Sequence, residues 1–122
     1  LQFGRVVENI IENSIRYKVT ERINVDISMK GTNHDVTLTF SDDGPGVPDE
    51  ALPRLFDSFY RTDKARTDVQ KGNGLGLALT KRIIEAMDGS IKAEKSKDHG
   101  LSLCITLPLA KEIEHREEHI DY

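Results

Sequence analysis

"KGNGLGLALTKR", residues 71–82, places three glycines at alternate positions and then continues into an amphipathic segment. Gly72, Gly74 and Gly76 allow a backbone to approach another group closely. Phosphate is a common group at a glycine-rich helix start, because free N–H groups and the helix dipole favour anions there. A dinucleotide-binding loop would need glycine where Leu77 stands, and a P-loop would need glycine followed by lysine and a hydroxyl residue. Neither loop fits, and a glycine hinge without a ligand stays an alternative at this point.

The composition indicates one globular domain. The chain has 122 residues, of which 37% are hydrophobic and 31% charged, enough for one core but too few for two domains. The net charge of −4 gives no support to a nucleic-acid partner, which favours a basic surface. No apolar run approaches the roughly 20 residues that cross a bilayer. The single cysteine, Cys104, excludes an internal disulfide, and its alternating neighbours predict a packed strand position.

The spacing of apolar residues predicts two long helices. In residues 1–17 apolar positions recur every three or four residues, as on one buried helix face. A second helix is expected over residues 75–87, with Gly89 as its C-terminal cap. A short helix is expected after Pro48, and residues 55–71 are expected to be mostly loop. The expected inward positions are Phe3, Val6, Val7, Ile10, Ile11, Ser14 and Ile15 in the first helix, and Leu75, Ala78, Leu79, Ile83, Ala86 and Met87 in the second.

Alternation predicts strands in two hairpins. Residues 23–30 and 36–40 alternate and are joined by a polar turn, which predicts an antiparallel hairpin with one covered face. Residues 90–96 and 101–108 predict the final hairpin. Because helices flank the strand pairs, the predicted fold class is α+β, a two-layer α/β sandwich whose mixed, mostly antiparallel sheet is covered on one face by helices. The covered positions expected in the first strand are Ile23, Val25, Ile27 and Met29.

Polar residues in two further segments suggest a ligand site. On the first helix Asn9, Asn13 and Arg16 fall within roughly 60° of each other beside the apolar stripe. An amide oxygen is a hard ligand suited to magnesium, although surface asparagines can give the same pattern. Asp42 opens "DDGPGVP" (residues 42–48) directly after a strand, and the glycines that follow allow a flat ligand to approach, as they would also form a plain turn.

These segments together resemble the ATP-binding catalytic domain of bacterial sensor histidine kinases, a Bergerat fold shared with gyrase, heat-shock chaperone and mismatch-repair ATPases. The stretches "VVENIIENSIRY" (6–17) and "DDGPGVP" (42–48) resemble the asparagine box and the first glycine box. "LFDSFYR" (55–61) is similar to the phenylalanine box, and residues 72–91 to the second glycine box with its helix. "DHGLSLCITLP" (98–108) resembles the closing glycine and strand. The segments occur in the family's order and cover nearly the whole chain.

The resemblance implies a role for each matching residue. Asn13, with Asn9, would hold magnesium on the triphosphate of ATP, and Asp42 would accept a hydrogen bond from the exocyclic amine of adenine. Residues 57–73 would form a mobile lid over ATP, and residues 72–77 would present N–H groups to the phosphates. The further ATP-binding residues that it implies are Arg16, Tyr17, Gly44, Gly46, Val47, Arg61, Lys64, Gly72, Asn73, Gly74, Leu75, Gly76 and Leu77.

This sequence departs from the family pattern at three of these places. Arg16 stands where lysine is frequent, and Asn73 where threonine or serine is frequent. Both changes keep a hydrogen-bond donor, so we expect ATP binding to persist. Ser14 stands where the family usually has alanine, which is a small change in volume.

The implied activity is a protein-histidine kinase that donates the γ-phosphoryl group to a histidine on a separate dimerisation domain. Through its parent protein the domain would act on a response regulator, as the cytoplasmic part of a membrane-anchored sensor. No segment resembles the acceptor pattern H-E-x-x-x-P, so the chain is not expected to phosphorylate itself, and Glu8 is the one candidate for a local base. Residues 1–109 are expected to form the catalytic domain, truncated at its N-terminus, and residues 110–122 a polar tail.

Two other readings stay open. The first is an anti-sigma-type serine kinase of the same fold, which the phenylalanine box disfavours. The second is a nucleotide-responsive regulatory module that transfers no phosphate, which would be favoured if the parent protein had no acceptor histidine.

Overall fold

The computed structural model describes residues 2–16, 18, 21–60, 76–97 and 100–109. The elements run in the order α1 (Gln2–Arg16), β1 (Val25–Gly31), β2 (Asp35–Asp42), the 3-10 helix η1 (Asp49–Arg54), α3 (Gly76–Ala86), β3 (Ser90–Lys95) and β4 (Leu101–Pro108). Four strands form one sheet in the order β1-β2-β4-β3, and every described pair is antiparallel. The predicted hairpins and helices are therefore confirmed, with bounds that shift by at most two residues.

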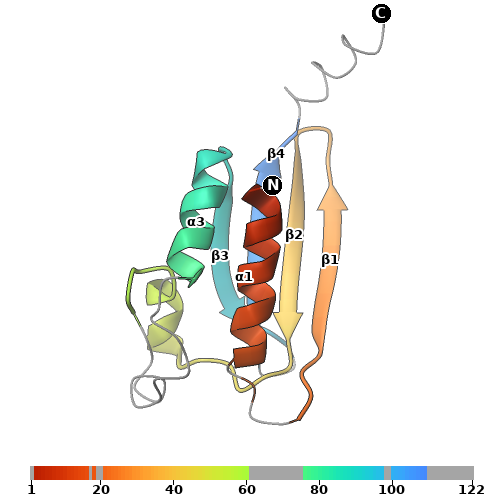
Figure 1. The fold of residues 1–122 in the computed structure, drawn as a ribbon. Coiled ribbons are helices and arrows are strands. Elements are labelled where there is room, and N and C mark those ends of the chain that lie inside the picture. Colours follow the sequence, from red (N-terminus) through yellow and green to blue (C-terminus); the bar gives the residue numbers. More distant parts are fainter. Residues whose placement is uncertain (1, 17, 19–20, 61–75, 98–99, 110–122) are drawn as a thin grey trace, which may run out of the picture.

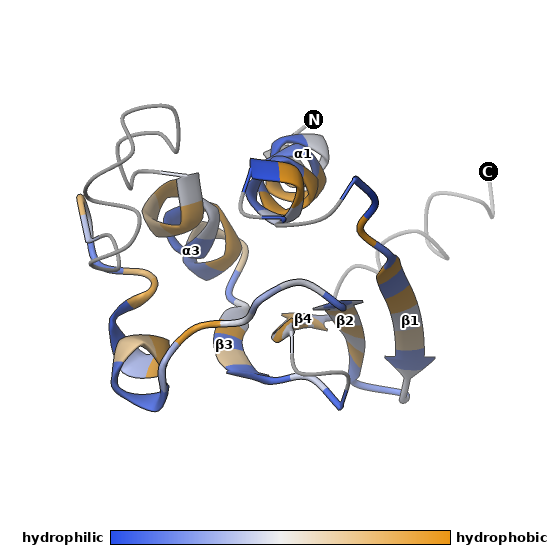
Figure 2. Cartoon of the chain, turned by 90° about the horizontal axis from the view of Figure 1, so that it is seen from below, coloured by the Kyte–Doolittle hydropathy of each residue, from blue (hydrophilic) through white to orange (hydrophobic). Residues whose placement is uncertain are grey.

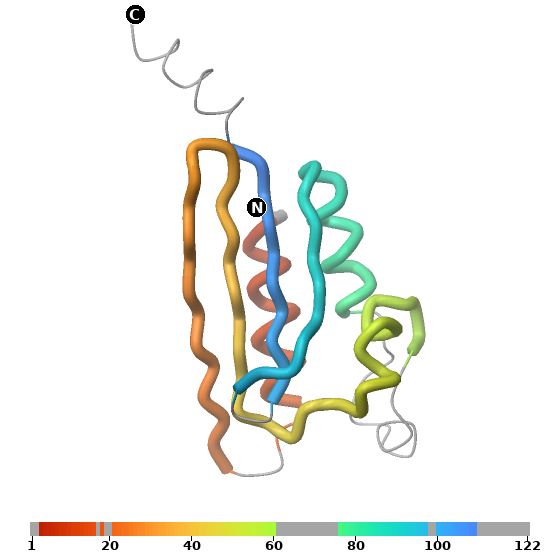
Figure 3. Tube along the Cα trace, turned by 180° about the vertical axis from the view of Figure 1, so that it is seen from behind, coloured from red at the N-terminus to blue at the C-terminus, as the bar shows by residue number. Residues whose placement is uncertain are grey.

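The elements form two layers. Helices α1 and α3 lie side by side on one face of the sheet (Figure 1). From the opposite side the strands lie in front of α1, and α3 is seen beside β3 (Figure 3). Hydrophobic residues, coloured orange in Figure 2, occur in both helices and in the strands. The buried core consists of Val6, Ile10, Phe40, Leu77, Ile83, Ile84, Leu101, Leu103 and Ile105. The predicted α+β sandwich is confirmed.

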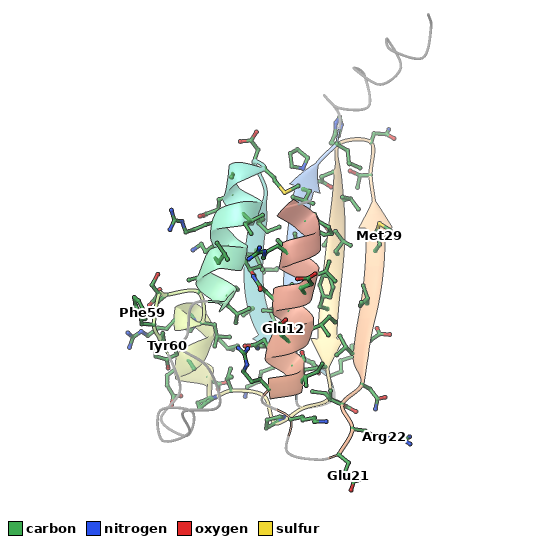
Figure 4. The ribbon with its side chains drawn as sticks, in the orientation of Figure 1. Glu12, Glu21, Arg22, Met29, Phe59 and Tyr60 are labelled. Atoms are coloured by element: carbon green, nitrogen blue, oxygen red, sulfur yellow. The ribbon has the colours of Figure 1, made fainter. Side chains whose placement is uncertain are left out.

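The covered face expected for the first strand is only partly right, because Ile23 and Val25 are half-buried but the rest of that face is exposed. Ile27 and Met29 are 51% and 68% exposed, although they lie opposite Phe40 and Leu38 and so on the helix-facing side of the sheet. The reason is position in the sheet: β1 is an edge strand, and it lies beside α1 rather than behind it (Figure 1). Met29 accordingly lies at the free edge of the domain (Figure 4). The alternating pattern predicted the strand correctly, but it could not show that no described helix covers this strand.

The inward face expected for the second helix is partly wrong. Ala78 and Ile83 are buried as expected, whereas Leu79 and Met87 are 40% and 38% exposed and Ala86 is exposed. Helix α3 packs against both the sheet and α1, so its buried surface is wider than one stripe and shifted around the helix. The buried residues of α3 are Leu77, Ala78, Thr80, Ile83 and Ile84.

The C-terminal cap of α3 also differs from the prediction. Asp88, not Gly89, takes the left-handed conformation, with φ 61°. The N–H groups of Asp88 and Gly89 donate to the carbonyls of Glu85 and Ile84 at 3.0 and 2.9 Å, which is the Schellman pattern of bonds. Glycine is required at position 89 for space instead, because a Cβ there would lie 2.5 Å from the Thr106 carbonyl oxygen.

The phenylalanine-box segment is described only up to Tyr60. Its ring lies against the guanidinium of Arg54, 4.5 Å from ring centroid to Cζ. Phe59 has a φ of 65° and is 68% exposed, and both rings lie beside η1 at the outside of the domain (Figure 4). The irregular structure predicted after residue 55 holds for this described part.

Candidate nucleotide-binding site

The ends of two helices and two strands lie close together at one end of the two-layer structure. The C-terminal ends of α1 and β2 lie there, together with the N-terminal ends of α3 and β4 (Figures 1 and 3). The asparagine box, the first glycine box and the helix of the second glycine box belong to these elements. Segments that are far apart in the sequence are thus brought to the same end of the domain.

Asp42, the last residue of β2, has its carboxylate fixed by hydrogen bonds from α1, from β4 and from the loop that follows β2. Its Oδ1 accepts the N–H groups of Gly44 and Leu101, both at 3.0 Å. Its Oδ2 accepts the hydroxyl of Ser14 on α1 at 2.9 Å. Bonds to a charged acceptor are stronger than those between neutral groups, so this half-buried carboxylate has a well-defined orientation between α1 and the sheet.

The backbone of Asp42 is held as closely as its side chain. Its carbonyl oxygen accepts the hydroxyl of Ser96 at 3.0 Å. Gly100 packs directly against it, and a Cβ at position 100 would clash with the carbonyl oxygen and with Oδ1 of Asp42. The β3–β4 connection therefore has direct contact with the end of β2, and glycine is required at this contact.

The two asparagines of α1 have different surroundings. The amide of Asn9 donates to Thr80 Oγ1 at 3.4 Å and to the Gly76 carbonyl at 3.5 Å, so Asn9 connects α1 to the first turn of α3. Asn13 is half-buried and has no hydrogen bond to any residue in the described ranges. The amide oxygens of both residues are therefore available to a ligand as far as the described residues are concerned.

Asp43 is oriented differently from its neighbour Asp42. It is exposed, and its carboxylate accepts the backbone N–H and the side-chain amide of Asn24 at 2.8 and 2.7 Å. These hydrogen bonds hold the pKa of Asp43 below its usual value. Asp43 therefore lies on the solvent side of the turn, and its carboxylate is already occupied by Asn24.

The other predicted residues in the described part differ in what they can contribute. Gly46 adopts a φ of 67°, which favours glycine, and Val47 is half-buried against the core. At Gly44 a Cβ would lie 3.1 Å from Ile23 Cδ1. Leu77 is only 8% exposed, so its side chain belongs to the core and only its backbone can face a ligand. Arg16 and Glu8 are exposed on α1, and Gly76 is the first residue of α3.

Part of the predicted site lies outside the described residues. These predictions are the lid beyond residue 60 and the polar tail 110–122. The site residues concerned are Tyr17, Arg61, Lys64, Gly72, Asn73, Gly74 and Leu75.

Sequence reasoning missed the residues that support Asp42. The apolar stripe correctly predicts the burial of Ser14, which is 6% exposed, but not its hydrogen bond to Asp42. Gly100 and Leu101 were assigned only to a closing glycine and strand. The signal available for Ser14 was the departure from the usual alanine. For Thr80, which is fully buried and bonded to Asn9, the signal was a hydroxyl residue one turn after Gly76.

The described residues include neither a metal-binding cluster of His, Cys, Asp or Glu side chains nor a helix that could span a membrane. In those ranges no group of three or more His, Cys, Asp or Glu side chains could hold a metal ion. None of the described helices has the length and apolar character needed to cross a bilayer.

Comparison with known proteins agrees with the arrangement. Residues 1–111 match the family of histidine kinase-, DNA gyrase B-, and HSP90-like ATPases. Sensor protein kinase WalK of Staphylococcus haemolyticus is 39% identical over 105 residues, covering 85% of this chain and 17% of that protein. Sensor histidine kinase CpxA of Escherichia coli is 42% identical over 105 residues, covering 86% of this chain and 22% of that protein. The chain thus spans about a fifth of the length of these relatives.

Solved structures show the same fold. The mycobacterial sensor histidine kinase MprB gives a TM-score of 0.76 at 26% identity, covering 88% of this chain and 72% of that one. Full-length ShkA in complex with AMPPNP gives a TM-score of 0.72 at 26% identity, covering 88% of this chain and 21% of that one. With residues 1–111 matched and the motifs gathered at one end of the sandwich, the chain belongs to the histidine kinase-, DNA gyrase B-, and HSP90-like ATPase family, as an ATP-binding catalytic domain of the sensor histidine kinase type.

Proposed function

We propose that this domain binds magnesium-ATP and donates the γ-phosphoryl group to a histidine on a separate dimerisation domain of its parent protein. The observation that carries the proposal is the oriented carboxylate of Asp42, which lies at the same end of the domain as the start of α3. The names of the relatives, which are sensor kinases, support the type of reaction.

The adenine end of the proposed site is the first glycine box. Asp42 Oδ2 accepts only the Ser14 hydroxyl among the described residues, so it retains acceptor capacity for the exocyclic amine of adenine. The absence of side chains at Gly44 and Gly46 allows the ring to lie against the backbone.

The phosphate end of the proposed site is the start of α3. This helix begins at Gly76, and its unpaired N–H groups and dipole favour an anion. Residues 72–77 would supply the N–H groups, and Arg61 and Lys64 would supply positive charge. Arg16 and Tyr17 would line the sugar and phosphate region.

The asparagines of α1 fit a magnesium ion bound to the triphosphate. Asn13 is half-buried and makes no hydrogen bond within the described ranges, and the donation by Asn9 through its amide nitrogen leaves its oxygen as an acceptor. Magnesium prefers oxygen ligands and is commonly bound through few protein groups together with substrate phosphates.

The chemistry assigned to this chain is positioning and charge neutralisation. Phosphoryl transfer depends mainly on alignment and on stabilisation of charge on the transferred group, so no covalent intermediate on this chain is needed. Glu8 is the candidate for a local base, and the main acid–base partner of the acceptor histidine is assigned to the separate domain. The same proposal includes transfer onward to a response regulator and a position on the cytoplasmic side of a membrane-anchored parent.

The test is phosphotransfer with radioactive γ-phosphate. The 122-residue chain is incubated with magnesium-ATP alone and with the histidine-containing domain of its parent protein. We expect no stable label on the chain itself and acid-labile label on the added domain. Acid-stable label on a serine would instead favour the serine kinase, and nucleotide binding without any transfer would favour the regulatory module.

Replacing Asn13 with alanine is expected to weaken binding of magnesium-ATP roughly tenfold, since one lost metal–ligand interaction of about 1.4 kcal/mol has that effect. Binding of ATP in the presence of EDTA should change little. Calorimetric titration of both forms measures the difference. The control is Asn33→Ala, an exposed asparagine in the β1–β2 turn, which should behave like the unsubstituted chain. Equal losses with and without magnesium would remove Asn13 from the metal site.

A further inference from the structure

The buried hydroxyl of Ser14 bonds to Asp42, and the proposed function assigns this hydroxyl no role. Ser14 lies on α1 with 6% of its surface exposed, and its hydroxyl donates to Asp42 Oδ2 at 2.9 Å. The position packs within the helix layer, where alanine would fill nearly the same space and has the higher helix propensity. Neither packing nor helix formation therefore explains the hydroxyl.

The hydrogen bonds of Asp42 can be counted against its acceptor capacity. A carboxylate has about four lone-pair positions, two on each oxygen. Two N–H groups, from Gly44 and Leu101, occupy Oδ1, and the Ser14 hydroxyl occupies one position of Oδ2. Within the described ranges, one acceptor position on Oδ2 remains.

We propose that Ser14 is a positioning residue that determines nucleotide specificity through Asp42. By occupying one side of Oδ2, its hydroxyl fixes the rotation of the carboxylate and leaves one acceptor position for one N–H donor, the exocyclic amine of a 6-aminopurine. The inference rests on the proposed function, because it assigns the remaining position to adenine. Without the hydroxyl, Oδ2 gains a second open position, and the carboxylate is held through Oδ1 only.

The proposal predicts that the effect of Ser14 depends on the amine of the ligand. The experiment is calorimetric titration of the 122-residue chain and its Ser14→Ala variant with two ligands: ATP, and purine riboside triphosphate, which lacks the exocyclic amine. Ser14→Ala should weaken ATP binding about fivefold to tenfold, the range expected for the loss of one typical hydrogen bond. The affinity for the purine analogue should stay within about twofold.

Ser102→Ala is the matched control. Ser102 is also buried, at 7% exposure, and its hydroxyl pairs with Ser41 Oγ at 2.9 Å rather than with Asp42. Its replacement should leave the affinity for both nucleotides unchanged. A second control introduces Ser14→Ala into an Asp42→Asn background, where it should cause no further loss of ATP affinity.

The outcomes separate this inference from the proposed function. If Ser14→Ala weakens ATP and the purine analogue equally, or leaves ATP binding unchanged while Asp42→Asn weakens it, the role of Ser14 is overturned and the adenine site stands. If Asp42→Asn leaves ATP affinity unchanged, the proposed adenine site fails, and the role of Ser14 fails with it.

Discussion

Replacing Gly100 with alanine should strongly destabilise the domain and remove its ATP binding. A Cβ at this position would clash with the backbone oxygen and the carboxylate of Asp42, and backbone cannot move aside as a flexible side chain can. Overpacking of this kind typically costs about 1–3 kcal/mol, sometimes more, and we expect about 3 kcal/mol here. For a domain of this size that corresponds to a fall in melting temperature of roughly 10 °C. Thermal unfolding followed by circular dichroism measures it.

Two glycine variants serve as controls for Gly100. Gly31 has open space around its Cα, so Gly31→Ala should melt like the unsubstituted chain. At Gly89 a Cβ would lie 2.5 Å from the Thr106 oxygen, so Gly89→Ala should also melt early. Thr106 lies opposite Thr37 near the other end of β2, and ATP affinity of the folded Gly89→Ala protein should be retained. If Gly100→Ala melts normally and binds ATP normally, the close packing around Asp42 is wrong.

Replacing Asp42 with asparagine should weaken ATP binding roughly 5- to 150-fold, equivalent to about 1–3 kcal/mol for an unpaired buried group. The variant keeps the shape of the side chain and one oxygen, which can still accept the N–H groups of Gly44 and Leu101. Its amide nitrogen replaces the Oδ2 that bonds Ser14, so a donor would face the adenine amine. The comparison is made by calorimetric titration with ATP.

Asp43→Asn is the matched control for the Asp42 substitution. Asp43 is the next residue, but its carboxylate bonds to Asn24 and is exposed. Its replacement should change ATP affinity by less than about twofold. An effect of Asp43→Asn larger than that of Asp42→Asn would assign the adenine pocket to the wrong carboxylate.

The sequence was sufficient to predict most of the fold because both periodicities are strong. The spacing in α1 placed Val6 and Ile10 correctly in the core, but Ile15, predicted on the same face near the end of the helix, is 50% exposed. Alternation located all four described strands. What periodicity could not predict was the extent of the helix layer. Ile27 has the pattern of a covered residue, yet it is 51% exposed because no described helix lies over the edge strand β1.

Local capping at the end of α3 shows another limit. A glycine two residues after a helix pattern favours a left-handed cap, but aspartate also tolerates this conformation, and Asp88 adopts it one residue earlier. Gly89 is explained instead by its distance from the Thr106 carbonyl on β4. Such contacts depend on how closely β4 packs against the end of α3, and the distance between the two elements cannot be predicted from a single sequence.

The candidate site was predictable where one residue type carries the chemistry. The types and positions of Asp42, Asn9 and Asn13 predict them as site residues, and the fold brings their elements to one end of the domain. The supporting contacts were not predictable, because Ser14 and Leu101 are 87 residues apart in the sequence and yet both donate hydrogen bonds to the Asp42 carboxylate. The sequence alone does not indicate which residue a serine in an apolar stripe, or a backbone N–H group, will contact.

The most direct test of the proposed adenine site is calorimetric titration of the unsubstituted chain with ATP and with GTP, both in magnesium. Asp42 Oδ2 retains one acceptor position in the described structure, which matches the exocyclic amine of adenine, whereas guanine presents a carbonyl oxygen at that place. An unpaired acceptor costs about 1–3 kcal/mol, so ATP should bind roughly 5- to 150-fold more tightly than GTP. Equal affinities for the two nucleotides would contradict the assignment of Asp42 to adenine.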